Sequence, residues 1–353
     1  MRIALNRVYY YAQVGYNCWF KGRTQVPYLP EYVSLELTNV CNFKCAFCPQ
    51  SNPNHLAALG RSYLKPDRAE LLLGKIRAAG ITTRLLHWTL DGEPFMNREF
   101  HKVCAVACRH GFDDMFFATN GTLASPRRMS QFPAEARYTL KIDYCADPDY
   151  FESVRGTPRS WQRIRDNVIA LITDDRFSNV RVLFTDISPF AFQDPAELAT
   201  RFQALKAMFP RSRRVSFATK TFHNATGYLG TPARRRAGRY VRCPYPWATL
   251  HVASNGDVVA CSRDLEHKTV LGNLLRQSLP EIWNGEPMQA LRRNLRDRHP
   301  ERSAACANCD LPYDGSKYTM RNLINTAAGR LQLVSGSGLA AAPSPPAQPR
   351  KSA

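Results

Sequence analysis

The stretch NVCNFKCAFCP, residues 39–49, decides how this chain is interpreted. It places Cys41, Cys45 and Cys48 at the spacing C-x3-C-x2-C, directly after an apolar run at 32–38 that predicts a strand. Three thiolates on one short loop can bind three irons of a cubane cluster and leave the fourth iron open. A structural zinc ion needs four protein ligands, and His55, the closest histidine, does not follow at zinc-finger spacing. The spacing therefore predicts a [4Fe-4S] cluster with an open iron site.

The region around this loop alternates short apolar runs with amphipathic stretches, as βα units around a parallel sheet do. The predicted strands cover 32–38, 84–90, 115–118, 138–142, 180–185 and 214–218. Helix signals lie between them, among them a capping box at Asp194 and Glu197 and an N-cap at Ser160. The predicted fold class is α/β, with a partial (β/α)6 TIM-type barrel over residues 32–225.

A second cysteine set follows the barrel. Cys243 and Cys261 flank Asn255-Gly256, which predicts a two-residue β-hairpin turn between 251–254 and 257–261 that brings the two thiols together. Cys306 and Cys309 follow at C-x2-C spacing. Four thiolates can bind either a tetrahedral zinc ion or a fully ligated cubane cluster. A small metal-binding domain is therefore expected at 243–318.

The cysteine triplet, with Phe47 directly before its last cysteine, resembles the defining loop of the radical S-adenosylmethionine superfamily. The resemblance extends over about residues 32–318. It implies that the open iron chelates the amino and carboxylate groups of S-adenosylmethionine, and that reduction cleaves the sulfonium to give a 5'-deoxyadenosyl radical. It also implies an active site at the carboxyl ends of the barrel strands, where parallel β/α barrels build theirs.

Other elements of the superfamily follow at the ends of predicted strands. Gly92, Glu93 and Pro94 resemble its Gly-Gly-Glu-Pro element, which holds the amino group of the cofactor, although Asp91 replaces the first glycine. An acidic side chain beside an ammonium group is favourable electrostatically. The resemblance therefore predicts that Gly92, Glu93 and Pro94 bind the cofactor.

Four later positions bear on the site, and three of them, Asn120, Arg155 and Cys145, are candidate site residues. Asn120 lies in a Thr-Asn-Gly sequence that either contacts the cofactor or forms a plain turn. Arg155 either pairs with the cofactor carboxylate or is a solvated arginine at a helix. Lys141 stands where the superfamily usually has serine, which puts a cofactor contact there in doubt. Cys145 follows a predicted strand and is a hypothetical hydrogen-atom donor to a substrate radical, as in epimerase-type members.

The C-terminal sequence resembles the SPASM extension of these enzymes, in the stretch from Cys243 to Trp247 and in the closing Cys306 and Cys309. The complete extension has additional cysteines soon after that pair and binds two auxiliary clusters. None follows Cys309 here, so we expect one auxiliary [4Fe-4S] cluster, held by Cys243, Cys261, Cys306 and Cys309. This cluster would accept the electron left on the substrate in a net oxidation, or pass electrons to the first cluster, or only stabilise the fold.

The remaining segments are assigned by composition. Residues 1–31 form an N-terminal extension, 226–242 a basic linker, and 333–353 a tail that we expect to be disordered. The extension mixes aromatic and basic residues, so it either packs on the main domain or lies on a membrane surface. It has no long apolar run, so we expect no signal peptide and no transmembrane segment. The eleven cysteines then favour metal or redox roles and a cytoplasmic location.

The net charge of +19 predicts an acidic partner. We expect an acidic flavodoxin or ferredoxin as electron donor, docked on the run from Arg234 to Arg242. We expect a small-molecule substrate, a polar metabolite such as a sugar, an aminocyclitol or a nucleotide-linked sugar. One alternative is radical modification of a residue in a ribosomal peptide. Another is a zinc-stabilised protein that binds nucleic acid, but no base-reading motif supports nucleic acid as a partner.

Overall fold

The computed structural model describes residues 2–220, 222–229 and 239–313, with side chains from residue 8 onward except that of residue 225. A nine-stranded sheet runs through it in the order β6-β5-β4-β3-β2-β1-β7-β8-β9. The first seven strands are Tyr32–Leu35, Leu85–Trp88, Asp114–Thr119, Arg137–Tyr144, Val180–Asp186, Val215–Thr219 and Thr249–Val252. These seven run parallel, whereas β8 (Asp257–Val259) and β9 (Val270–Asn273) are antiparallel to their neighbours.

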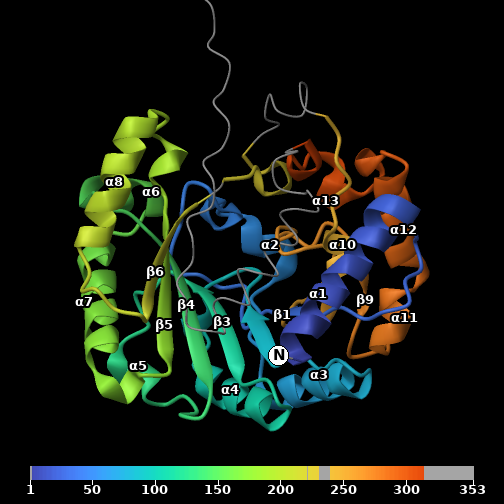
Figure 1. Cartoon of the computed structure of the whole chain (residues 1–353), viewed down its shortest axis with the longest axis horizontal. Coiled ribbons are helices and arrows are strands. Elements are labelled where there is room, and N and C mark those ends of the chain that lie inside the picture. Colours follow the sequence, from blue (N-terminus) through green and yellow to red (C-terminus); the bar gives the residue numbers. More distant parts are fainter. Residues whose placement is uncertain (1, 221, 230–238, 314–353) are drawn as a thin grey trace, which may run out of the picture.

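The helices that connect the barrel strands lie outside the curved sheet, around the arc of strands (Figure 1). These helices are α3 (Pro66–Ala78), α4 (Phe100–Arg109), α5 (Pro126–Met129), α6 (Pro148–Arg155), α7 (Ser160–Thr173) and α8 (Pro195–Ala207), and the short α2 (His55–Leu59) follows the cysteine triplet. All six predicted barrel strands are present. The α/β fold with a partial barrel is therefore confirmed.

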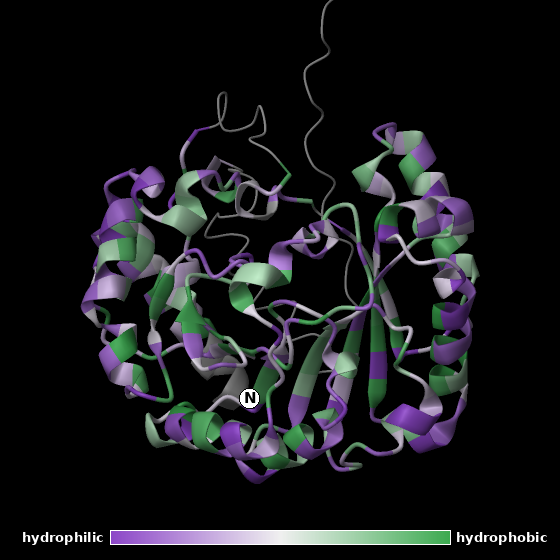
Figure 2. Cartoon of the chain, turned by 180° about the vertical axis from the view of Figure 1, so that it is seen from behind, coloured by the Kyte–Doolittle hydropathy of each residue, from purple (hydrophilic) through white to green (hydrophobic). Residues whose placement is uncertain are grey.

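Alternation along the strands separates a helix-facing side from a concave side. On β4, Tyr138, Leu140, Ile142 and Tyr144 are buried, and the ring of Tyr144 stacks on that of Trp161 from α7 at 5.8 Å. The residues between them belong to the opposite face, and Figure 2 shows the strands in mixed green and purple for this reason. Polar groups of alternate residues are thus directed to the concave side.

The C-terminal part extends the same sheet, because β7 pairs in parallel with β1 and Ser34 lies opposite His251. Its helices are α10 (Tyr245–Ala248), α11 (Leu279–Trp283), α12 (Glu286–Arg296) and α13 (Ala304–Ala307). Ser278 and Glu281 form a complete capping box at the start of α11. The cysteine-bearing segment is therefore joined edge to edge with the barrel.

The predicted two-residue turn at Asn255-Gly256 was wrong in length. The backbone nitrogen of Ala253, the residue after β7, donates to the oxygen of Asp257 at 2.8 Å, so these two residues still pair and the turn between them has three residues, 254–256. The carboxylate of Glu36 explains the extra residue, because it accepts from both the backbone nitrogen and the hydroxyl of Ser254 at 3.0 and 2.6 Å. Gly256 supplies the positive φ of +91° that such a loop requires.

Two helix starts also differ from expectation. Ser160 is the first residue of α7 and not its N-cap, a place taken by Arg159 in a left-handed conformation; the hydroxyl of Ser160 donates to the Thr157 oxygen at 2.7 Å. Asp194 does cap α8 by accepting from the backbone nitrogen of Glu197 at 2.7 Å. The carboxylate of Glu197 accepts from Arg201 at 3.0 Å, so the pair is not the reciprocal box that was predicted.

The N-terminal segment packs on the C-terminal part of the chain. It consists of α1 (Arg2–Gly15) and η1 (Tyr16–Lys21). The Tyr10 hydroxyl donates to the Ala248 oxygen at 2.8 Å, and the Trp19 indole donates to the Arg242 oxygen at 2.9 Å. One face of this segment is therefore fixed to the domain that holds the second cysteine set.

Some sequence expectations fall outside the described residues. These are the arginines at 234–236 and the tail at 333–353. Within the described ranges, no helix has the length and apolar character needed to cross a bilayer.

Candidate active site

The loop that follows β1 brings Cys41, Cys45 and Cys48 together. The backbone nitrogen of Cys48 donates to the Cys45 oxygen at 3.0 Å, and that of Ala46 donates to the Val154 oxygen of α6 at 2.8 Å. Cys45 is buried and the other two are partly buried. The three thiols act on each other electrostatically, as expected for a shared ligand set.

Arg155 lies behind this loop, at the end of α6. It is 5% exposed, and its guanidinium lies 5.2 Å from the centre of the Phe43 ring and 5.6 Å from that of Phe47. Burial disfavours its charge, but the nearby cysteine thiols and Asp143 favour it, and the net effect raises the pKa of Arg155. The alternative of a solvated arginine is wrong, because this side chain is a buried cation that faces the cysteine triplet, while binding of the cofactor carboxylate stays a prediction.

Gly156 allows α6 to press against the cysteine loop. Its φ is +65°, and a Cβ there would lie 2.9 Å from the Lys44 carbonyl oxygen. An L side chain would meet both the strained backbone conformation and this close contact. The Arg-Gly pair thus positions the cation directly beside the loop.

The donor set fits an iron–sulfur cluster. Burial raises the pKa of the Cys48 thiol to about 12 and that of Cys41 further, so the metal-free thiols are neutral at ordinary pH. Thiolate formation in such a setting requires a compensating cation, which a metal cluster provides. In the described part of the chain, no three candidate side chains are arranged for a single metal ion. A cubane cluster spreads its irons over a larger volume and accepts more widely spaced sulfurs.

The segment after β2 is locked against the same loop. The φ of Gly92 is +68°, and a Cβ there would lie 2.2 Å from the Thr38 carbonyl oxygen, so only glycine fits. The backbone nitrogen of Glu93 donates to the Val40 oxygen at 2.9 Å. Pro94 then opens the short helix η3 (Pro94–Met96).

The carboxylate of Glu93 is buried and occupied by groups of this chain. It accepts from the Thr119 hydroxyl at 2.6 Å, from the backbone nitrogen of Asn120 at 2.6 Å and from that of Phe95 at 3.2 Å. Burial raises the pKa of Glu93, and these hydrogen bonds oppose that change. Glu93 thus joins the ends of β2 and β3, and any ammonium of a bound cofactor would be a further donor to it.

Asn120 reaches the cysteine loop directly. Its side-chain nitrogen donates to the side-chain oxygen of Asn42 at 2.8 Å, and Asn42 lies between Cys41 and Cys45. Its side-chain oxygen accepts from the Thr122 hydroxyl at 2.6 Å. The Thr-Asn-Gly sequence is therefore a turn that also contacts the cysteine loop.

Sequence reasoning missed a polar network on the other side of the loop. Asp91 accepts from the side-chain nitrogen of Gln50 at 2.8 Å and lies 2.6 Å from Nε2 of His55. Burial lowers the pKa of His55, but the hydrogen bond to Asp91 and the negative charges of Asp91 and Glu266 together outweigh burial and raise that pKa. Asp91, which replaces the usual glycine, thus anchors the segment directly after the triplet.

A cluster of charges on the concave side was also missed. Asp143, on β4, accepts from Lys220 and from the hydroxyl of Thr185, and it lies 3.3 Å from Nζ of Lys141 and 3.7 Å from Arg155. Burial alone would raise the pKa of Asp143, but the three cations lower it well below its usual value. The ammonium of Lys220 also lies 4.7 Å from the centre of the Phe47 ring. The cluster connects β4, β5 and β6 with the cysteine loop.

Cys145 is buried just beyond β4. Its thiol donates to the Asp147 oxygen at 3.4 Å, and burial raises its pKa to about 12. Asp186 and Arg201 are also among its charged neighbours. The thiol is therefore neutral, and its predicted role in hydrogen donation stays a prediction.

The second cysteine set also converges. Cys243 precedes α10, Cys261 follows β8, Cys306 lies in α13, and the backbone nitrogen of Cys309 donates to the Cys306 oxygen at 3.1 Å. Each thiol is an electrostatic neighbour of the others, and burial raises the pKa of Cys261 to about 12. Four neighbouring thiols, of which Cys309 is buried and the other three are partly buried, fit a fully ligated cluster, and zinc remains the alternative by ligand type alone.

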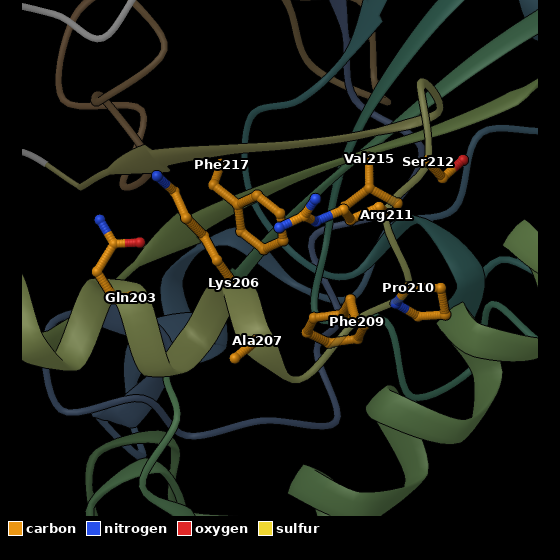
Figure 3. A pocket seen from close by; sticks show the side chains of 9 residues that line it. All are labelled: Gln203, Lys206, Ala207, Phe209, Pro210, Arg211, Ser212, Val215 and Phe217. Atoms are coloured by element: carbon orange, nitrogen blue, oxygen red, sulfur yellow. The ribbon is translucent and has the colours of Figure 1, made fainter.

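A cavity of about 460 Å³ lies elsewhere, between α8 and the open edge of the sheet at β6. Figure 3 shows Gln203 and Lys206 rising from α8 and Phe217 lying on β6. None of the predicted site residues lines it.

Comparison with known proteins agrees with this arrangement. Residues 243–310 match the SPASM iron-sulfur cluster-binding domain. A stretch of 68 residues is 31% identical to the S-adenosyl-L-methionine-dependent 2-deoxy-scyllo-inosamine dehydrogenase of Niallia circulans, covering 19% of this chain and 27% of that protein. The antilisterial bacteriocin subtilosin biosynthesis protein AlbA of Bacillus subtilis is 21% identical over 87% of this chain and 73% of its own length.

The solved structures include BtrN in complex with AdoMet and 2-DOIA. It superimposes with a TM-score of 0.56 at 16% identity, covering 80% of this chain and 93% of BtrN. That similarity establishes a shared fold. The match to the dehydrogenase and those to three GTP 3',8-cyclases span only 27% to 43% of the relatives' lengths.

Proposed function

We propose that this chain, a radical S-adenosylmethionine enzyme with a C-terminal SPASM domain, abstracts a hydrogen atom from a small polar metabolite and oxidises it. The substrate class we favour is an aminocyclitol, a sugar or a nucleotide-linked sugar. The observation that carries the proposal is the cysteine triplet held against the buried cation of Arg155, at the carboxyl ends of β1, β2 and β3. The similarity to a dehydrogenase of an aminocyclitol supports the substrate class.

The residues that would hold the cofactors are those of the site. Cys41, Cys45 and Cys48 would bind a [4Fe-4S] cluster, whose open iron and bound S-adenosylmethionine supply a 5'-deoxyadenosyl radical when an electron arrives. The backbone around Gly92, with Glu93 and Pro94, would orient the amino group of S-adenosylmethionine. Asn120 fixes the cysteine loop through Asn42.

With a cluster bound, the cation of Arg155 would have two anionic neighbours, the cysteine thiolates and Asp143. It faces the cysteine sulfurs, and it lies 3.7 Å from Asp143. A carboxylate of bound S-adenosylmethionine would be a further partner, because guanidinium groups bind carboxylates through paired hydrogen bonds. Lys220 and Lys141 also pair with Asp143, so Arg155 shares that carboxylate with two other cations and could bind a further anionic partner.

The four C-terminal thiols would hold one auxiliary [4Fe-4S] cluster. A bound cluster would supply a one-electron acceptor: removal of a hydrogen atom would leave one electron on the substrate, and transfer of this electron to the cluster, with loss of a proton, would complete a two-electron oxidation. Cys145 as a hydrogen donor would instead return a hydrogen atom. Replacement of Cys145 by alanine distinguishes the two, because only a donor role stops product formation while 5'-deoxyadenosine is still released.

Electron delivery by an acidic flavodoxin or ferredoxin is part of the proposal. It rests on charge, since the chain carries +19. Charge reversal at Arg234, Arg235 and Arg236 should slow reduction by the protein donor and leave reduction by dithionite unchanged. Equal rates with both donors would contradict docking at these arginines.

A second candidate is modification of a residue in a ribosomal peptide. The match to AlbA, a bacteriocin biosynthesis protein, favours it because that match extends over 87% of this chain. The two candidates differ in what stimulates turnover. A peptide substrate would accelerate 5'-deoxyadenosine release, whereas aminocyclitols would not.

The test uses anaerobically reconstituted full-length protein with S-adenosylmethionine and dithionite. We expect 2-deoxy-scyllo-inosamine or a related polyol to increase 5'-deoxyadenosine release and to yield one ketone product per 5'-deoxyadenosine. A panel of aminocyclitols and sugars that leaves the release unchanged would contradict the substrate class, while basal release would still support the radical chemistry.

A further inference from the structure

Exposed apolar side chains are concentrated on the N-terminal segment. Four of the seven large apolar side chains that are exposed in the described chain belong to it: Val8 at 45%, Tyr9 at 66%, Tyr16 at 48% and Phe20 at 73%. The other three, Leu71, Leu229 and Val270, lie apart from one another in the sequence. Single exposed apolar residues are normal on a protein surface, but a contiguous group marks an interaction site.

The exposed group follows helical spacing. Tyr9, Tyr16 and Phe20, which we call the aromatic stripe, are exposed together with Ala12 at intervals of three and four residues. The opposite face contains Tyr10, Val14 and Cys18, which are 5%, 0% and 0% exposed. In Figure 1, α1 lies on the outside of the C-terminal domain beside α10 and α12. The fold thus uses one face of the segment and leaves the aromatic stripe to solvent.

The charge of the segment has one sign. Residues 1–30 contain no aspartate or glutamate. Lys21 and Arg23 are exposed, and the ammonium of Lys21 lies 5.6 Å from the centre of the Tyr16 ring. The segment therefore presents cations next to an apolar stripe, on a chain whose net charge is +19.

We propose that the aromatic stripe binds the surface of an anionic phospholipid bilayer, with α1 and η1 lying in the plane of the interface. Apolar side chains on one face of a helix enter the boundary between headgroups and acyl chains, while flanking cations attract anionic headgroups. Tyrosine suits this position because its ring is apolar and its hydroxyl is polar. A bilayer also accommodates a convex helical surface, whereas a protein partner would have to supply a matching groove.

The domain behind the stripe gives the contact a fixed orientation. The Trp247 indole donates to the Arg23 oxygen at 2.7 Å, and the Asn284 side chain exchanges hydrogen bonds with the backbone of Val26 at 3.0 and 2.9 Å. The segment is therefore continuous with the SPASM domain, and membrane binding would place the whole enzyme at the bilayer surface.

Sedimentation with vesicles tests the proposal on the full-length reconstituted protein. The vesicles contain either phosphatidylcholine alone or equal parts of phosphatidylcholine and phosphatidylglycerol. We expect sedimentation with the anionic vesicles only, weakened by added salt. The double variant Tyr9→Asp/Phe20→Asp should lower the partition coefficient at least about 10-fold, since two rings leave the interface and two anions enter it.

Leu71→Asp is the matched control, because Leu71 is 61% exposed on α3 and far from the stripe in sequence. It should sediment like the unmodified protein, and all three proteins should release 5'-deoxyadenosine at the same rate. No sedimentation with either vesicle, or sedimentation that the double variant retains, would overturn the proposal. A double variant that keeps its binding to vesicles and loses binding to an acidic electron-carrier protein would overturn the proposal and assign the aromatic stripe to protein docking.

Discussion

The backbone nitrogen of Asn120 donates to the carboxylate of Glu93 at 2.6 Å, and this bond joins the loop after β2 to the loop after β3. The same carboxylate accepts from Thr119 and Phe95. Because Glu93 also donates its backbone nitrogen to Val40 beside the cysteine triplet, one residue aligns three strand ends. The glutamate is thus a structural centre of the site in addition to a candidate cofactor ligand.

Replacement of Glu93 by alanine should lower the free energy of unfolding by about 3 kcal/mol, because three donors would lose a buried anionic acceptor. Denaturant titration of the reconstituted protein measures this. Glu99→Ala is the control, since that carboxylate forms a surface ion pair with Lys65 and its loss should change the free energy of unfolding much less. Equal effects of the two substitutions would show that the bonds of Glu93 do not hold the loops.

Lys220→Met should destabilise the barrel by about 2 kcal/mol, because it removes one of the cations that balance the partly buried Asp143. Lys102→Met, an exposed lysine 3.5 Å from Glu99, should cost less than about 0.5 kcal/mol. Addition of Asp143→Asn to Lys220→Met should recover part of the loss, as a double-mutant cycle would reveal. Simple additivity of the two substitutions would exclude a coupled pair.

His251 predicts an acid sensitivity of folding. It is fully buried, and burial together with Arg263 lowers its pKa to about 3. A lowered histidine pKa means that the folded protein favours the neutral ring. The contribution of His251 to the free energy of unfolding is therefore fully present above the pKa of an unfolded histidine, about 6.5, and it is lost as the pH falls towards 3. Between pH 7 and pH 5 the contribution of His251 should fall by about 2 kcal/mol.

Glu36 opposes that effect, so the measurement must be a difference. Burial raises the pKa of Glu36 to about 7. The contribution of Glu36 to the free energy of unfolding is therefore fully present at a pH below the pKa of an unfolded glutamate, and it is lost as the pH rises through 7. The unfolding free energy of the unmodified protein minus that of His251→Gln isolates the histidine. This difference should decrease by about 2 kcal/mol from pH 7 to pH 5, and a constant difference would contradict the buried neutral ring.

The sequence predicted what local patterns determine. Strand and helix periods gave the six barrel strands, and the spacing of Cys41, Cys45 and Cys48 gave the ligand loop. The Lys220 and Asp143 pair had no such signal, because it depends on β4 and β6 lying on the two sides of β5. The pairing of β1 with β7 likewise joins segments more than two hundred residues apart.

Local rules failed where tertiary contacts outweighed them. Asn255-Gly256 favours a two-residue turn, but the hydrogen bonds between Ser254 and Glu36 hold a longer loop. Asp91 departs from the superfamily pattern, and only the fold reveals its partners Gln50 and His55. Contacts of this kind can be inferred only when the arrangement of the strands and loops in space is already known.

The auxiliary cysteines predict a defined iron content. Two cubane clusters require about eight irons per chain, and replacement of Cys306 by alanine should lower the content towards about four. Cys108→Ala is the control, since that thiol lies on α4 outside both cysteine sets. About four irons in the unmodified protein, together with one zinc, would assign the C-terminal set to zinc.

The most direct test measures 5'-deoxyadenosine from the reconstituted protein with S-adenosylmethionine and dithionite under anaerobic conditions. The unmodified chain should release it slowly even without substrate, and the triple variant Cys41→Ala/Cys45→Ala/Cys48→Ala should release none while keeping the auxiliary iron. Absence of release from the unmodified chain, or equal release from the triple variant, would contradict the radical chemistry assigned to this loop.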